Sequence, residues 1–218
     1  MKNVYAILLF ALFPIALFAV DDVASAIQEY PVYKALEANE TISKQFLQYM
    51  EWLSDKSPDA TFVYQLMQNK ANSLDAIAVI FHEKVEFYEW LKLGHRFEDI
   101  MTVEYFQKHY PDVYPIVHRR ALIEEINLIK YFAQKKGFSN IPEIAYNLVS
   151  PIIEKYNVSV ARFQKRLKVN LEYQAQMQFL SENDLKIAIT VYEAGGYQFK
   201  EKDRIFAEAM TLIADSKK

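Results

Sequence analysis

The chain has 218 residues, no cysteine and a formal charge of −3, with 25 lysines and arginines against 28 aspartates and glutamates. The lack of cysteine excludes disulfides, thiolate metal sites and thiol nucleophiles, and the mild acidity argues against nucleic acid as the main partner. Only four glycines and seven prolines interrupt the chain, and segments that alternate regularly between polar and apolar residues are hard to find. We therefore predict an all-α fold, a multi-helix globule held together by apolar packing.

An apolar segment at the N-terminus indicates export. Residues 4–20 are almost continuously apolar and contain Pro14, a length and composition that favour a cleaved signal over a permanent membrane helix. We expect a signal peptide of residues 1–19, with cleavage after Ala19 or after Ala26, and an uncleaved anchor is the alternative. No later segment is apolar over the length of a membrane span, so we expect a secreted, extracellular protein.

Two sequons are present, at Asn39 and Asn157. In an exported chain they predict N-glycosylation, which would place both residues in surface turns.

Apolar periodicity and helix caps predict roughly nine to eleven helices. In the first half the predicted helices cover 23–30, a short segment after Pro31, 41–54, a helix capped by Ser57 and a longer one from Ser73 to Gly94. In the second half they cover 102–109, 113–118, 122–134, a helix from Ser139 to about Ser150, a long helix reaching towards Phe179, 181–192 and 199–214. We expect Pro111 to separate the first two of these, because proline disrupts a helix interior.

A weak internal repeat divides the chain. A shift of 82 residues aligns Tyr49 with Tyr131 and Phe81 with Phe163, and the helix caps and apolar stripes fall in step. We therefore predict two related helical units, 27–110 and 111–192, followed by a C-terminal helix in 193–218, all within one compact domain. The alternative is that helical proteins share such patterns by chance.

A local motif resembles that of a known family. Residues 128–138, followed by the apolar helix at 144–149, resemble the insect allergen-related repeat family, in which a Tyr-Leu-x-x-x-Gly-Leu stretch precedes an apolar helix. Tyr131 and Gly137 match that stretch with one more residue between them, whereas the first half of the chain has Asp55 in place of the glycine.

The resemblance, which covers residues 40–190, implies a protein secreted into the gut lumen whose helices enclose an apolar cavity for fatty acid or phospholipid. The expected function is therefore non-enzymatic lipid binding. The candidate lipid contacts are the apolar residues of the helix stripes: Phe46, Tyr49, Met50, Phe62, Leu66, Ile77, Phe81, Val85, Tyr88, Phe132, Ile144, Leu148, Phe163 and Leu167. Without the resemblance, an ordinary dense core explains the same stripes. The alternative function is a secreted structural or protein-interaction component with a solid core, which an exposed apolar groove would favour.

Four basic residues lie together on the polar side of a predicted helix: Arg162, Lys165, Arg166 and Lys168. Such a surface permits transient contact with an anionic membrane, and a solvated outer face is the alternative.

We expect no catalytic, cofactor or metal site, because no His-Glu-x-x-His, Gly-x-Ser-x-Gly or phosphate-binding glycine loop occurs. His82 and Glu86 lie one helical turn apart and could touch a metal ion, although such a pair more often lies on a solvated helix face. An enzyme or metal protein that uses His82, His109 or His118 is the third hypothesis, and two of these histidines converging in a cleft would support it.

Overall fold

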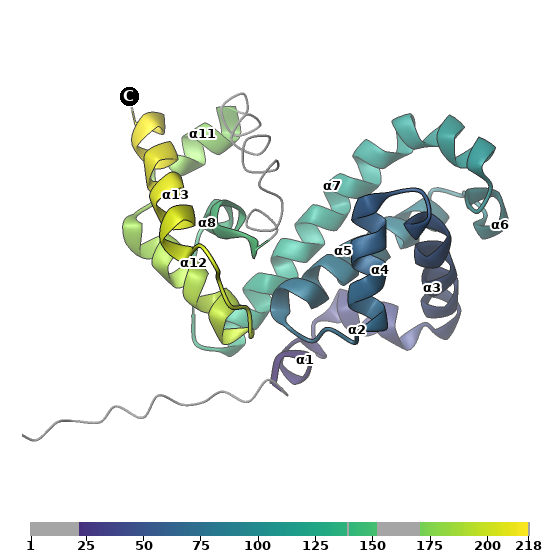
Figure 1. Ribbon diagram of the computed structural model, residues 1–218, viewed down its shortest axis with the longest axis horizontal. Helices are drawn as coiled ribbons and strands as arrows, with labels where there is room; N and C mark the ends of the chain where they lie inside the picture. Colours follow the sequence, from purple (N-terminus) through teal and green to yellow (C-terminus); the bar gives the residue numbers. More distant parts are fainter. Residues whose placement is uncertain (1–21, 139, 152–170, 218) are drawn as a thin grey trace, which may run out of the picture.

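The computed structural model describes residues 22–138, 140–151 and 171–217, which contain eleven helices and no strand. This confirms the all-α prediction (Figure 1). The helices are α1 (Asp22–Ile27), α2 (Pro31–Ala38), α3 (Glu40–Ser54), α4 (Pro58–Gln68), α5 (Leu74–Lys92), α6 (Phe97–Ile100), α7 (Val103–Lys135), α8 (Glu143–Val149), α11 (Leu171–Met177), α12 (Glu182–Ala194) and α13 (Lys202–Ser216). Within the described ranges, no helix combines the length and the apolarity needed to cross a membrane.

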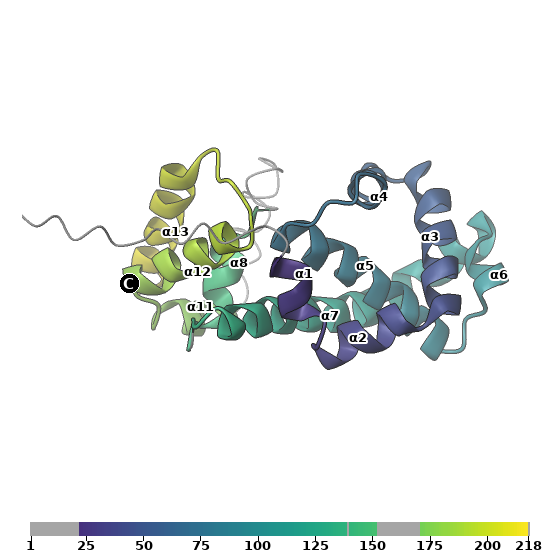
Figure 2. The same ribbon diagram turned by 90° about the horizontal axis from the view of Figure 1, so that it is seen from below.

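Helix α7 is the axis of the molecule, and α5 lies alongside it (Figures 1 and 2). Helices α2, α3, α4 and α6 gather around α5 and the N-terminal part of α7. Helices α8, α11, α12 and α13 gather at the C-terminal end of α7. Helix α1 packs against α7 between the two groups and buries Val23 and Ile27.

The prediction that Pro111 separates two short helices is wrong. Helix α7 runs without interruption through Pro111 and Pro115, so the boundary between the two predicted repeat units falls inside it. Each proline removes one backbone donor, but packing offsets this loss, because Val117 and Ala121 are fully buried. The aromatic rings of α7 also stack at four-residue steps, with 4.6 Å between the ring centroids of Tyr110 and Tyr114.

Several predicted helix ends are confirmed. The Ser57 side chain accepts a hydrogen bond from the backbone of α4, and Ser181 forms a reciprocal capping box with Asp184 at the start of α12. Helix α8 ends at Val149, next to Ser150 and Pro151, as predicted. The predicted cap at residue 139 and most of the long helix predicted to follow Pro151 lie outside the described residues.

Helix α5 is buried on most of its surface, and two kinds of contact hold it. Aromatic contacts join it to α3, where the rings of Tyr49 and Phe87 stack with centroids 5.0 Å apart. Its buried Lys84 donates hydrogen bonds to the Glu37 carboxylate at 2.8 Å and to the Ser43 hydroxyl at 2.9 Å. This lysine therefore ties α5 to α2 and α3.

A close backbone approach connects the two groups of helices. The backbone N–H of Leu74, the first residue of α5, donates to the carbonyl oxygen of Gly195 at 2.8 Å. A Cβ atom added to Gly195 would lie 2.3 Å from the Cβ of Leu74. The contact therefore requires a residue without a side chain.

We predict that Gly195→Ala lowers the free energy of unfolding by about 1–3 kcal/mol, because its methyl group would overlap the fully buried Leu74. Urea unfolding followed by circular dichroism measures the change. The control is Gln198→Ala, at an exposed position of the same connection, which should shift stability by no more than about 0.5 kcal/mol. Equal stability of the two variants would contradict the predicted contact.

Candidate functional site

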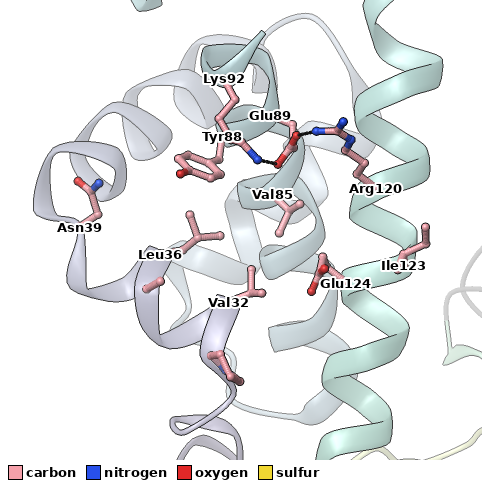
Figure 3. A pocket seen from close by; sticks show the side chains of 12 residues that line it. Val32, Leu36, Asn39, Val85, Tyr88, Glu89, Lys92, Arg120, Ile123 and Glu124 are labelled. Carbon is pink, nitrogen blue, oxygen red and sulfur yellow. Dashed lines mark hydrogen bonds and ion pairs between the residues drawn. The ribbon is translucent and has the colours of Figure 1, made fainter.

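A groove of about 490 Å³ lies between α2, α5 and α7 (Figure 3). Its walls are largely apolar and include Val32 and Leu36 of α2, Val85 of α5 and Ile123 of α7. The volume is within the range of small-molecule sites, about 300–1,000 Å³. Unlike the enclosed cavity that we expected from the family resemblance, this space opens to solvent.

Charged groups line one end of the groove. The carboxylate of Glu89 accepts hydrogen bonds from Lys92 at 2.7 Å and from Arg120, as the dashed lines in Figure 3 show. Although burial by itself raises the pKa of Glu89, the hydrogen bonds from these two cations hold it below its usual value. Two cations surround the Glu89 carboxylate at this end, whereas a second carboxylate, Glu124, lines the groove beside Ile123. The charges of the whole lining therefore balance, and the positive ones gather at one end.

The predicted lipid contacts are mostly elsewhere. Of the twelve candidates among the described residues, Val85 and Tyr88 alone line the groove. Eight others are buried in the core, namely Phe46, Tyr49, Met50, Ile77, Phe81, Phe132, Ile144 and Leu148. Phe62 and Leu66 are half-buried, and Phe163 and Leu167 lie outside the described residues, as do Asn157, Arg162, Lys165, Arg166 and Lys168.

Sequence reasoning missed most of the groove. Pro31, Val32, Ala35 and Leu36 belong to the short helix predicted only as a segment after Pro31. Ile123 of the charged helix α7 is 48% exposed. An apolar residue at a position that faces solvent was the one sequence signal for the groove.

A second set of residues converges where α5 faces the middle of α7. His82 and Glu86, one turn apart on α5, meet His118 of α7. The Oε1 atom of Glu86 lies 2.9 Å from Nε2 of His82 and 2.5 Å from Nδ1 of His118, and the two nitrogens are 3.1 Å apart. We call these three residues, together with Glu125, the His–Glu centre. Among the described residues, the donor atoms of His82, Glu86 and His118 lie close enough together to hold one metal ion.

Glu125 contacts the other ring nitrogen of His82, the one that does not face Glu86. Its Oε2 lies 2.8 Å from Nδ1 of His82, so the imidazole bridges carboxylates of two helices. His82 is 6% exposed and Glu86 is 9% exposed, whereas the side chain of His118 is 26% exposed. The centre is therefore buried on the α5 side and reaches solvent through His118.

Electrostatics in the His–Glu centre follow from this geometry. Burial by itself lowers the pKa of His82, but hydrogen bonds to Glu125 and Glu86 and their negative charges raise it to about 10. Burial by itself raises the pKa of Glu86, and hydrogen bonds with His118 and His82 bring it below its usual value. Beside them, burial and the charge of Glu86 raise the pKa of Glu83 to about 7.

The other two histidines form a separate cluster. His95 lies 2.9 Å from the hydroxyl of Tyr105, and its ring contacts that of His109 with centroids 5.4 Å apart. His82 and His118 thus meet in a largely buried contact between α5 and α7, whereas His109 does not join them.

Comparison of the chain with models of known protein families, with curated proteins and with solved structures finds no match. The resemblance to the insect allergen-related repeat family stays a prediction.

We predict that His82 makes stability fall as the pH rises from 7.5 to 9.5. A histidine whose pKa is higher in the folded state, here about 10 against a usual 6.5, stabilises the fold fully below pH 6.5 and loses that contribution as the pH rises through the folded pKa. In a chelating buffer, the free energy of unfolding should fall by up to about 1.4 kcal/mol per pH unit. His82→Gln should flatten this slope, and the control His109→Gln should keep it. Parallel slopes for wild type and His82→Gln would rule out the raised pKa.

Proposed function

We propose that this is a secreted protein that binds fatty acids or similar amphipathic lipids, without converting them, in the groove between α2, α5 and α7. The observation that supports the proposal is one groove that combines an apolar wall with Lys92 and Arg120 at its end. An acyl chain lies along the wall formed by Val32, Val85 and Ile123, and its carboxylate faces the two cations.

The energetics suit a weakly selective ligand site. Each buried methylene stabilises the complex by about 0.8 kcal/mol, and no hydrogen bond to the chain is needed. Because the groove is open, only part of the acyl chain is buried, so we expect modest affinity and tolerance of different chain lengths. Binding requires no catalytic group.

Export is the second part of the proposal. Residues 4–20 have the composition of a signal segment, and α1 begins at Asp22 and buries Val23 and Ile27. Cleavage after Ala19 leaves α1 intact, whereas cleavage after Ala26 removes Val23 from its contacts. We therefore favour Ala19 as the cleavage site.

A protein-interaction component is the second candidate function. The groove is open rather than enclosed, and Ile116 and Ile123 expose about half of their surface on α7. A stable protein interface, however, buries about 1,200–2,000 Å² in total, whereas a concave site of about 490 Å³ has the size of a small molecule. The lipid therefore fits better.

We predict that Ile123→Asp weakens binding of a fluorescent fatty acid by about tenfold or more, because it places a carboxylate in the apolar wall. Ile123 is 48% exposed, so the variant should fold. The matched control is Leu122→Asp, next to it on α7, exposed and not part of the groove, which should bind like wild type. Titration and displacement by unlabelled C16–C18 acids give the affinities. No saturable binding to wild type, or equal loss in both variants, would contradict the lipid proposal.

The cationic end gives a separate test. Lys92→Gln should weaken binding of a fatty acid by about threefold, the effect of a half-exposed ion pair. It should leave the affinity for the fatty alcohol of equal chain length unchanged, because the alcohol has no charge. Displacement titrations with the acid and the alcohol measure both. An equal effect on the two ligands would place the headgroup elsewhere.

Glycosylation at Asn39 tests export. Asn39 is exposed at the rim of the groove, and its Oδ1 accepts a hydrogen bond from the backbone of Ile42 at 3.1 Å, which caps α3. A glycan attached to the amide nitrogen is compatible with this cap. Protein secreted by eukaryotic cells should lose one glycan in Asn39→Asp, which keeps the capping oxygen, and also in Thr41→Ala. Unchanged electrophoretic mobility of both variants would show that Asn39 is unmodified.

A further inference from the structure

We propose that His82, Glu86 and His118 bind one divalent late transition-metal ion, of the class of zinc. This site lies on a different face of α5 from the groove and goes beyond the lipid-binding proposal. Nothing in the inference depends on whether the groove takes a lipid.

The three donor atoms are spaced for one ion. In a tetrahedral zinc site with metal–ligand distances of about 2.0–2.2 Å, neighbouring ligand atoms lie about 3.3–3.6 Å apart. The corresponding separations here are 2.5, 2.9 and 3.1 Å among Oε1 of Glu86, Nε2 of His82 and Nδ1 of His118. Side-chain adjustments of less than about 1 Å would open the triangle to admit the ion.

Glu125 would not bind the ion itself but would hold the imidazole of His82 in place. Metal-binding histidines commonly donate their second ring N–H to a carboxylate, which fixes the tautomer and strengthens the metal-binding nitrogen. Nδ1 of His82 lies 2.8 Å from the Glu125 carboxylate, which leaves Nε2 facing Glu86 and His118. The His–Glu centre therefore contains both the ligands and the group that orients one of them.

Local charge favours a cation. The carboxylates of Glu86 and Glu125 lie within the centre, and that of the half-buried Glu83 lies beside it. The buried Lys84 is bound instead to Glu37 and Ser43. In a medium of low dielectric constant an excess of carboxylates attracts a divalent ion strongly. A bound divalent ion would offset the negative charge of these carboxylates.

The donor set selects the class of metal. Two imidazole nitrogens and one carboxylate oxygen suit zinc, copper, nickel or iron, whereas calcium and magnesium require oxygen ligands. Three protein ligands leave a fourth position open, and the partly exposed His118 lies on the side where solvent or a small anion can enter. The ion would therefore be exchangeable.

Metal titration of the full mature chain tests the proposal. The protein is produced without a polyhistidine tag, stripped with EDTA and titrated with Zn²⁺ by isothermal calorimetry, and Co²⁺ serves as the spectroscopic probe. We expect one equivalent of Zn²⁺ to bind and to raise the melting temperature. We also expect Co²⁺ to give the visible absorption of a four-coordinate site, and millimolar Ca²⁺ or Mg²⁺ to displace neither ion.

Four variants locate the ion. His118→Ala and Glu86→Gln should each reduce Zn²⁺ affinity by more than about 100-fold, and Glu125→Gln by about 10–100-fold with an altered Co²⁺ spectrum. The matched control His109→Ala lies in the other histidine cluster and should bind like wild type. His118 is partly exposed, so circular dichroism of His118→Ala should show a folded protein.

Three outcomes would overturn the inference. These are no Zn²⁺ binding by folded wild-type protein, equal affinity in wild type and His118→Ala, and loss of binding in His109→Ala instead. Each measurement is made without lipid, so failure of the metal site and failure of the groove are distinguishable.

Discussion

The pairing of α5 with α7 is the constraint on which the rest of the structure depends. Charged groups on the two helices meet across it: His82 and Glu86 contact Glu125 and His118, and Glu89 binds Arg120. Removing one member of such a buried group leaves the other uncompensated, at a cost of about 3–5 kcal/mol. These contacts therefore fix the register of α5 against α7, which apolar stripes alone would leave free to slide by a turn.

The same register creates both candidate sites, because they use different faces of one helix pair. On α5, Val85, Tyr88 and Glu89 line the groove, whereas His82 and Glu86 enter the His–Glu centre. A change in the distance between α5 and α7 would alter both sites together. The groove also needs α2, whose Leu36 is buried against the core and whose Val32 forms the opposite wall.

Features that depend on neighbouring residues, such as helix caps, could be predicted from the sequence. Features that depend on packing between distant segments could not. Ser57 and Ser181 cap helices as their neighbours in the sequence indicate. The rule for Pro111 failed because burial of Val117 and Ala121 outweighs the two hydrogen bonds lost at Pro111 and Pro115. The spacing of His82 and Glu86 was visible within one helix. His118, 36 residues further on, meets them only through the crossing of α5 and α7, which no local pattern specifies.

The residue types of the His–Glu centre favour a role beyond stabilising the fold. Replacing buried ion pairs with apolar residues of similar volume is often neutral or stabilising, and 52% of this chain is hydrophobic. Beyond fixing the register of α5 against α7, two imidazoles and two carboxylates between these helices would add little stability that apolar packing could not supply. A bound cation changes that balance, because its charge compensates the carboxylates and its coordination bonds use the donor atoms that already face one another. The centre then contributes to folding when the metal is present, and α5 and α7 are the two helices that the ion would join.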